Sequence, residues 1–194
     1  MKTYRAVLFA LAAVSLALVA VHNAEAKDHP ASDAAAPAAS VQPAVGQPAP
    51  DFSLPSTSGG KVKLHGLKGR TVVLYFYPKD ETPGCTHEAC DFRDHVAALD
   101  SAGVVVLGVS TDDLASHRHF REKEHLPFPL LADVGARVCR LYGVYKEREH
   151  DGKKFTGIER TTFVIDKSGR IARVWPRVDV NGHVAEVLEF VKGS

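Results

Sequence analysis

Two short apolar stretches, separated by a segment with helical periodicity, constrain this chain more than any other feature of its sequence. Residues 72–77 (VVLYFY) and 104–109 (VVVLGV) are uninterrupted runs of the length typical of strands buried on both faces of a sheet. Between them, apolar side chains recur at intervals of three and four positions: Cys85, Ala89, Phe92, Val96 and Leu99. This interval predicts a helix with one apolar face. A sheet covered by helices is therefore expected.

The rest of the sequence repeats this alternation. A hairpin is expected at 52–64 around the turn sequence STSGG, and Ser110-Thr111-Asp112 is expected to cap a helix that runs to His125. The later elements are predicted as a strand at 127–132, a helix capped by Asp133 that ends at Tyr142, strands at 161–165 and 171–175 joined by a turn at 166–169, and a helix at 183–192. This α/β order indicates a mixed central sheet flanked by helices. It resembles the thioredoxin fold with an N-terminal β-hairpin and one inserted helix–strand unit.

Residues 1–26 have the features of a cleaved signal peptide. Lys2 and Arg5 form a short positive region, residues 6–21 are almost continuously apolar, and Ala24-Glu25-Ala26 fits a signal-peptidase site. The alternative is an uncleaved membrane anchor. At about 1.5 Å per residue, however, the apolar run spans roughly 24 Å, short of the ~30 Å hydrocarbon core of a bilayer. We therefore expect an exported, periplasmic protein with no stable membrane insertion after cleavage.

Residues 27–47 are rich in alanine, proline and serine and have no apolar period. Such a segment cannot bury enough surface to offset the entropy of ordering, so it is predicted to be a disordered linker before one domain at 48–194. The chain has a net charge of only +1. The basic cluster at 61–70 lacks interleaved aromatic residues and is interpreted as a solvated loop, so no nucleic-acid partner is expected.

The chain has three cysteines, Cys85, Cys90 and Cys139. Cys85 opens the predicted helix directly after Pro83-Gly84. The unpaired N–H groups and the positive end of the helix dipole then face its sulfur, which favours the nucleophilic thiolate. A buried structural cysteine is the alternative, but the Pro-Gly pair exposes backbone and leaves room for a small reactant. Cys85 is therefore interpreted as a reactive thiol.

Cys90 lies further along the same predicted helix. In an ideal helix the side chains of Cys85 and Cys90 would be about 140° apart and their Cα atoms roughly 8.6 Å apart. A disulfide tolerates a separation of up to about 7 Å. The two thiols therefore cannot bond while the helix is intact, and a bridge requires its first turns to unwind. This geometry suits a reversible, catalytic disulfide better than a permanent crosslink.

The string Pro78-x-x-x-Thr82-x-x-Cys85 resembles the signature of the reactive cysteine in peroxiredoxins. TPGCT followed by Cys90 is similar to the peroxiredoxin Q branch (bacterioferritin comigratory protein) of these AhpC/TSA-like thiol peroxidases. The resemblance runs from about Gln47 to the C-terminus and includes the strings YFYPK, LGVST and RTTFVID. It implies a thioredoxin fold and a thiol-dependent hydroperoxide reductase.

The resemblance also implies a role for each matching residue. In that family the cysteine matching Cys85 becomes a sulfenic acid, and the residue matching Cys90 resolves it as an intramolecular disulfide. Thr82 and Arg160 match residues that hydrogen-bond peroxide and thiolate, and Pro78 matches a proline that shields the site. The fixed donors of a guanidinium suit that role, because they stabilise both the thiolate and the leaving hydroxide. Thr82 is also placed to cap the helix.

The implied substrates are hydrogen peroxide and organic hydroperoxides, and the implied reductant is a thioredoxin-like protein. No cofactor and no metal are implied, and members of this branch are often monomers. The reversible sulfenic acid is protected from further oxidation when a second thiol traps it. The resemblance therefore predicts a self-contained catalytic cycle in one chain.

Some alternatives remain open on the residues alone. Cys139 is interpreted as a small, semi-buried hydrophobe, and a second resolving thiol is the alternative. Histidines on the predicted helices, His87 and His95 on one and His117, His119 and His125 on the next, are interpreted as solvated rather than as metal patches. The rival functions are an exported thioredoxin-fold copper chaperone and a thiol–disulfide oxidoreductase. Copper carriers of this fold use a tighter thiol pair than C-x4-C, and oxidoreductases use C-x-x-C, which the chain lacks.

Overall fold

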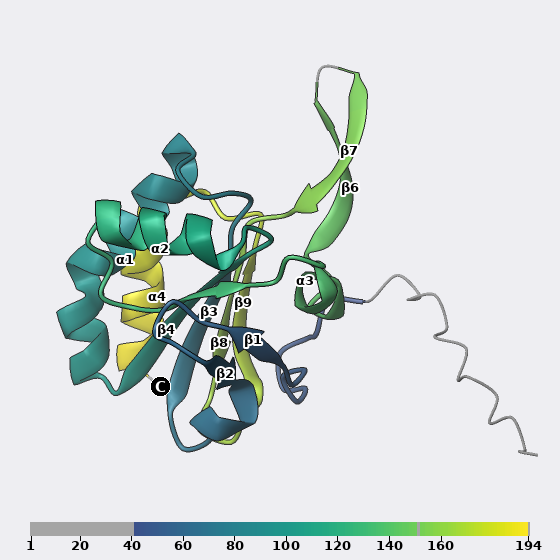
Figure 1. Ribbon diagram of the computed structural model, residues 1–194. Helices are drawn as coiled ribbons and strands as arrows, with labels where there is room; N and C mark the ends of the chain where they lie inside the picture. Colours follow the sequence, from purple (N-terminus) through teal and green to yellow (C-terminus); the bar gives the residue numbers. More distant parts are fainter. Residues whose placement is uncertain (1–40, 151, 194) are drawn as a thin grey trace, which may run out of the picture. The chain divides into compact units, whose positions relative to one another are not determined.

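The computed structural model describes residues 41–150 and 152–193 (Figure 1). The predicted signal peptide and residues 27–40 of the predicted linker lie outside the described residues. Among the helices in the described part of the chain, none combines the length and the apolar character needed to span a bilayer.

A five-stranded mixed sheet forms the centre of the domain, in the order β5-β4-β3-β8-β9. β3 (Thr71–Phe76) pairs in parallel with β4 (Val104–Ser110), which pairs in parallel with β5 (Leu130–Ala132). On its other side β3 pairs antiparallel with β8 (Thr161–Ile165), which pairs antiparallel with β9 (Ile171–Pro176). The predicted mixed sheet and thioredoxin-like arrangement are confirmed.

Two apolar clusters cover the two faces of the sheet, because successive side chains of β3 point in opposite directions. Val73 and Tyr75 pack with α1 (Pro83–Ser101) and α4 (His183–Lys192) on one face. Leu74 and Phe76 pack on the other face, with residues of α3 (Arg137–Leu141) and of the N-terminal hairpin. α2 (Leu114–Lys123) contributes Phe120 to the first cluster. Figure 1 shows α1, α2 and α4 together on one side of the sheet and α3 on the other.

The N-terminal hairpin consists of β1 (Ser53–Pro55) and β2 (Lys61–Lys63), as predicted, and is followed by a short 3-10 helix, η1 (Leu64–Leu67). Backbone hydrogen bonds join residues just before the predicted boundary at residue 48 to the start of β9. The N–H of Gly46 donates to the carbonyl of Ile171, and the N–H of Ile171 donates to the carbonyl of Gln47. The last residues assigned to the linker are therefore tied to the start of β9.

A second hairpin, β6 (Tyr145–His150) and β7 (Lys153–Ile158), was not predicted. It extends away from the central sheet in Figure 1. Most of the described side chains of β7 are exposed, so neither face needs the apolar alternation that marks a strand in a sequence. The dipeptide Asp151-Gly152 was the available signal, since Asp-Gly is typical of tight hairpin turns.

Several helix and strand boundaries differ from the prediction. α1 starts at Pro83 and ends at Ser101. Asp113, not Asp112, caps α2, because its carboxylate accepts the N–H groups of Ala115 and Ser116. α3 starts later than predicted, at Arg137, and Asp133 does not cap its first turn. The Asp133 carboxylate instead accepts the N–H of Cys139 within that helix. The strand expected at 127–132 is shorter, covering only β5.

Candidate active site

Cys85 lies in the first turn of α1, directly after the loop that leaves β3. Pro83 occupies the start of the helix, where its fixed φ suits the helix and its missing N–H costs nothing. The Cys85 side chain is only 1% exposed and packs with the apolar cluster that contains Tyr75 and Phe92. The predicted placement of a thiol at the start of this helix is confirmed.

Arg160 supplies a direct contact to the Cys85 sulfur. It lies between β7 and β8, and its backbone is held there because its carbonyl accepts the N–H of Val178. The Nη2 group of Arg160 donates to Cys85 Sγ at 3.3 Å. A guanidinium in this position stabilises negative charge on the sulfur. The fold thus brings together Cys85 and Arg160, the two residues that the family resemblance pairs.

Glu88 contacts the other side of the same guanidinium, although it is not among the site residues predicted from the sequence. It lies one turn after Cys85 on the inner face of α1, is 0% exposed, and its Oε2 accepts a hydrogen bond from Arg160 Nη1. Burial raises the pKa of Glu88 to about 7, against the opposing effect of Arg160. Its Oε1 has no hydrogen-bond partner among the described residues. A carboxylate on the apolar face of the predicted helix was the signal that could have revealed it.

Thr82 occupies the N-cap position of α1, but its side chain makes no capping hydrogen bond. Its hydroxyl donates instead to the carbonyl of Lys79 at 3.0 Å, and its own carbonyl accepts the N–H of Thr86 at 2.9 Å. The expected side-chain cap is therefore wrong. The hydroxyl stabilises the loop between Pro78 and Cys85 instead.

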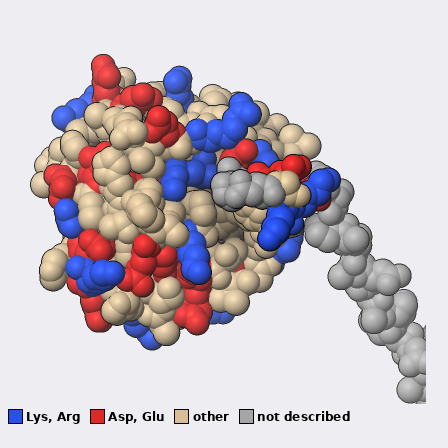
Figure 2. All heavy atoms as spheres, turned by 90° about the horizontal axis from the view of Figure 1, so that it is seen from above, with Lys and Arg blue, Asp and Glu red and all other residues tan. Residues whose placement is uncertain are grey.

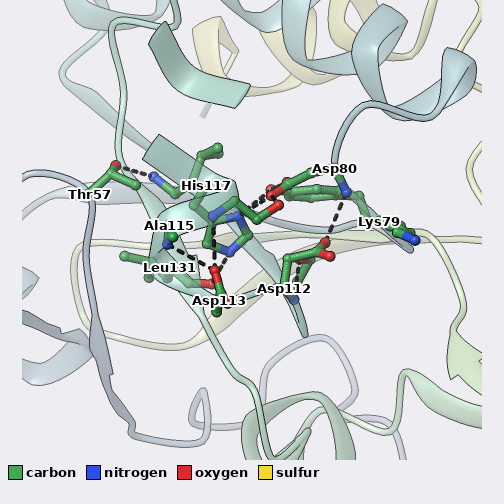
Figure 3. Close-up of polar contacts among 12 residues, drawn as sticks. Thr57, Lys79, Asp80, Asp112, Asp113, Ala115, His117 and Leu131 are labelled. Atoms are coloured by element: carbon green, nitrogen blue, oxygen red, sulfur yellow. Dashed lines mark hydrogen bonds and ion pairs between the residues drawn. The ribbon is translucent and has the colours of Figure 1, made fainter. Parts of the chain in front are cut away.

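A polar cluster anchors this loop; we call it the Asp80 cluster, formed by Tyr77, Asp80, Ser116 and His117. Figure 3 labels Asp80 and His117, which point toward each other. The Asp80 carboxylate accepts hydrogen bonds from the Tyr77 hydroxyl and the Ser116 hydroxyl, both at 2.7 Å. It also lies 2.8 Å from Nδ1 of His117, which is 0% exposed. Burial raises the pKa of Asp80, but the hydrogen bonds and charge of its partners, His117 first, lower it overall.

His117 was interpreted from the sequence as a solvated histidine, and that interpretation is wrong. Its Nε2 lies 3.2 Å from the carbonyl of Leu131, an atom that only accepts hydrogen bonds. Its Nδ1 lies 2.8 Å from the Asp80 carboxylate and 3.3 Å from the Tyr77 hydroxyl, so both ring nitrogens have polar partners. The backbone N–H of Asp80 in turn donates to Asp112 Oδ2 at 2.9 Å. The loop before Cys85 is therefore tied to α2, β5 and the end of β4.

The residue after Asp80 shows why this anchor is needed. Glu81 has a φ of 59°, the left-handed region that non-glycine residues rarely adopt. Such a conformation persists only where the surrounding contacts determine it. The Asp80 cluster on one side and the start of α1 on the other provide those contacts. The loop shape that presents Thr82 and Cys85 is thus stabilised by tertiary interactions.

The two other cysteines differ sharply in their surroundings. All three cysteines are free thiols and lie in the described part of the chain. α1 is continuous through Cys85 and Cys90, so the predicted separation of the two thiols within one intact helix holds. Cys139 is 0% exposed and belongs to the cluster on the opposite face of the sheet. Burial raises the pKa of its thiol strongly. These surroundings favour the interpretation of Cys139 as a buried hydrophobe over a second resolving thiol.

A groove of about 470 Å³ lies between the loop before Cys85 and the β6–β7 hairpin. Pro78 is exposed and lines it, together with Lys79, Thr111, Tyr145, Glu149, Phe155, Thr156, Gly157 and Ile158. Figure 2 looks down on this end of the molecule and shows Lys and Arg side chains interspersed with Asp and Glu side chains. Pro78 and Lys79, on one edge of the groove, precede Cys85 in the chain, and Ile158, on the other edge, precedes Arg160.

A reactive thiol at the start of a helix, contacted by a guanidinium and placed at the end of a thioredoxin-like sheet, defines the class of thiol-dependent redox enzymes. The chain matches the AhpC/TSA family over residues 45–174 and belongs to that family. The relatives narrow this assignment to peroxiredoxins. Peroxiredoxin Bcp of Bacillus subtilis is 48% identical over 148 residues, which cover 76% of this chain and 94% of the relative.

Other relatives agree with this assignment. A Coxiella burnetii relative with a Bcp name is 56% identical over 144 residues, covering 74% of this chain and 95% of the relative. The structure of Xanthomonas campestris peroxiredoxin Q has a TM-score of 0.70 and 40% identity, covering 73% of this chain and 90% of that one. The bacterioferritin comigratory protein of the same organism has a TM-score of 0.73 and 38% identity, covering 77% and 98%. These similarities support a thiol peroxidase over a copper chaperone or a thiol–disulfide oxidoreductase.

Proposed function

We propose that this protein reduces hydroperoxides through a sulfenic acid on Cys85, which Cys90 resolves as an intramolecular disulfide. The observation that carries the proposal is the 3.3 Å contact from Arg160 Nη2 to Cys85 Sγ in the first turn of α1. It places fixed positive charge beside a thiol that also faces a helix N-terminus. No cofactor is required, because the sulfur itself accepts the oxygen.

In the first step the Cys85 thiolate attacks the terminal peroxide oxygen. A sulfur–oxygen bond forms, the oxygen–oxygen bond breaks, and the second oxygen leaves as hydroxide or alkoxide and takes up a proton. Arg160 stabilises the charge that moves from sulfur to the leaving oxygen. The Thr82 hydroxyl, at the start of the same helix, is positioned to bind the peroxide once its contact with Lys79 is exchanged.

In the second step Cys90 attacks the sulfenic sulfur of Cys85. The disulfide forms, the sulfur–oxygen bond breaks, and the thiol proton leaves with the hydroxide as water. Because the intact helix keeps the Cα atoms roughly 8.6 Å apart, the first turns of α1 unwind for this step. A thioredoxin-like dithiol then reduces the disulfide by thiol exchange and is itself oxidised. The chain carries both cysteines, so it can act as a monomer.

Organic hydroperoxides fit the site as well as hydrogen peroxide does. The groove beside Pro78 offers Tyr145, Ile158 and the 48% exposed Phe155 as apolar contacts for an organic group. Alkyl peroxide reduction is the activity ascribed to the structurally similar bacterioferritin comigratory protein of Xanthomonas campestris. We therefore propose that the groove receives the organic part of such a substrate while Cys85 attacks its peroxide group.

Mass spectrometry after one equivalent of hydrogen peroxide tests the two cysteine roles. The wild-type protein should lose two hydrogens and give a peptide that links Cys85 to Cys90. Cys90→Ser should instead trap a sulfenic acid on Cys85, which dimedone labels. Cys139→Ser serves as the control and should behave as wild type. A persistent sulfenic acid in the wild type, or a bridge to Cys139, would contradict the assignment.

We also propose that residues 1–26 direct export to the periplasm and are removed. The basic start, the apolar run and the Ala24-Glu25-Ala26 sequence support this. Expression of the full chain in a Gram-negative host, followed by fractionation and N-terminal sequencing, tests it. A periplasmic protein that starts at Lys27 is expected, and a membrane-bound or uncleaved product would contradict it.

A further inference from the structure

Cys90 lies in a closed set of contacts between α1 and the end of α2. Its half-buried thiol donates to Glu124 Oε2 at 3.5 Å. Nη1 of Arg93 donates to Cys90 Sγ at 3.4 Å and also to the backbone carbonyl of Glu124 at 2.8 Å. The three residues therefore form a triangle in which the resolving thiol lies between a carboxylate and a guanidinium.

The charges in this triangle oppose ionisation of the thiol. Burial, together with the hydrogen bond to Glu124 and the charges of Glu124 and Asp94, raises the pKa of Cys90, and Arg93 lowers it only in part. The Arg93 charge is shared, because its Nε also donates to Asp94 at 2.8 Å. In the folded helix these contacts disfavour the Cys90 thiolate, so Cys90 should attack a peroxide or a foreign disulfide more slowly than a free cysteine does, since the thiolate is the nucleophile.

We infer that Glu124 is a positioning residue that keeps Cys90 protonated and unreactive while α1 is folded, and releases it as a nucleophile when α1 unwinds. This rests on the resolving role proposed above for Cys90. Unwinding of the first turns carries Cys90 away from Glu124, an anchor that belongs to another helix. The resolving thiol then regains the properties of a free cysteine at the step in which it must attack the sulfenic acid.

The contact geometry gives opposite roles to the two charged partners. Glu124 holds the proton on Cys90, whereas Arg93 stabilises the thiolate that remains if the proton leaves. Substituting Glu124 should therefore ease ionisation of Cys90, and substituting Arg93 should hinder it. If Arg93 and Glu124 only held α1 against α2, either substitution would loosen the helix and expose Cys90 in the same way.

The test measures alkylation of Cys90 by iodoacetamide as a function of pH, followed by peptide mass spectrometry, in full-length Cys85→Ser protein. Alkylation of Cys90 in the Cys85→Ser protein does not depend on peroxidase activity, so its outcome can be distinguished from a failure of the proposed function. Glu124→Gln should lower the pH midpoint and speed alkylation at pH 7.5 by roughly 3- to 10-fold, which corresponds to about half to one pKa unit. Arg93→Gln should raise the midpoint.

Glu122→Gln is the matched control, because Glu122 is exposed on the same helix and carries the same charge. It should leave the midpoint unchanged. In denaturant all variants should share one midpoint, since the triangle is then lost. An unshifted midpoint in Glu124→Gln, or shifts of the same sign in Glu124→Gln and Arg93→Gln, would overturn the inference.

Discussion

The guanidinium of Arg160 lies 3.3 Å from the sulfur of Cys85, although 75 positions separate the two residues in the sequence. The same guanidinium is bound on its other side by the fully buried Glu88. Arg160 is thus held between two groups of α1, the thiol in its first turn and a carboxylate one turn later.

Replacing Arg160 should remove most of the reactivity of Cys85 towards peroxide. Arg160→Gln should lower the second-order rate constant for hydrogen peroxide by about 10²- to 10³-fold, because a fixed donor to the developing charge is lost. Arg160→Lys keeps the positive charge but loses the planar guanidinium with its several donors. Its rate constant should therefore lie between those of the wild type and Arg160→Gln. Competition kinetics against a reference peroxidase measures the effect, with the exposed Arg118→Gln as control. A loss below threefold in Arg160→Gln would exclude the role.

Gly84 tests how closely the guanidinium is positioned. A Cβ at residue 84 would lie 3.3 Å from Nη2 of Arg160, which is closer than an ordinary contact. Gly84→Ala should therefore push the guanidinium away from Cys85 and reduce the peroxide rate constant several-fold, with little change in stability. Stopped-flow kinetics and urea denaturation measure the two quantities. An unchanged rate constant would show that Arg160 tolerates the displacement.

The Asp80 cluster should contribute strongly to stability. Asp80→Ala removes the acceptor that Tyr77, Ser116 and His117 share, and leaving a buried polar group without its partner typically costs about 1–3 kcal/mol. Urea denaturation should show this loss, whereas the exposed Asp100→Ala should stay within about 0.5 kcal/mol. The peroxide rate constant of Asp80→Ala should also fall, because the loop that presents Thr82 loses its anchor. A stable variant with normal kinetics would contradict both expectations.

Glu88 should make the folded protein less stable as the pH rises. Its pKa is raised from 4.5 to about 7, so between these values the folded state keeps a proton that the unfolded state has released. Stability from this group is greatest below pH 4.5 and decreases towards pH 7 by up to about 1.4 kcal/mol per pH unit. Glu88→Gln should abolish this contribution. Urea denaturation at several pH values measures how the free energy of unfolding changes with pH. The same pH dependence in the wild type and in Glu88→Gln would contradict the prediction.

His183 should make the folded protein less stable as the pH falls, which is the opposite of the effect of Glu88. This residue is buried, its Nε2 lies 2.8 Å from the Thr162 hydroxyl, and burial lowers its pKa from 6.5 to about 4. As the pH falls from 6.5 to 4, the unfolded state takes up a proton that the folded state refuses, so stability is lost on acidification. In the wild type this slope offsets that of Glu88 between about pH 4.5 and 6.5. His183→Gln should therefore expose a decline in stability with rising pH, and Glu88→Gln should expose a rise.

The sequence alone determined the elements that bury apolar surface and the chemistry that depends on local geometry. The runs that became β3 and β4, the inner face of α1 and the bounds of α4 follow from hydrophobic periodicity, because each of these segments packs in the core. The position of Cys85 at a helix start follows from Pro83-Gly84, and the separation of Cys90 from Cys85 follows from the helix itself. These are short-range properties, and neighbouring residues suffice to encode them.

Only the tertiary structure decided the polar partners. Arg160 could be paired with Cys85 through the family resemblance, but its contact with Glu88, the burial of His117 against Asp80, and the contact of Glu124 with Cys90 join residues from different elements. The β6–β7 hairpin escaped detection because most of the described side chains of β7 are exposed, so that strand needs no apolar pattern. Charged side chains that look solvated in a sequence become buried partners when distant strands and helices meet, since a buried charge is tolerated only beside a group that the fold brings to it.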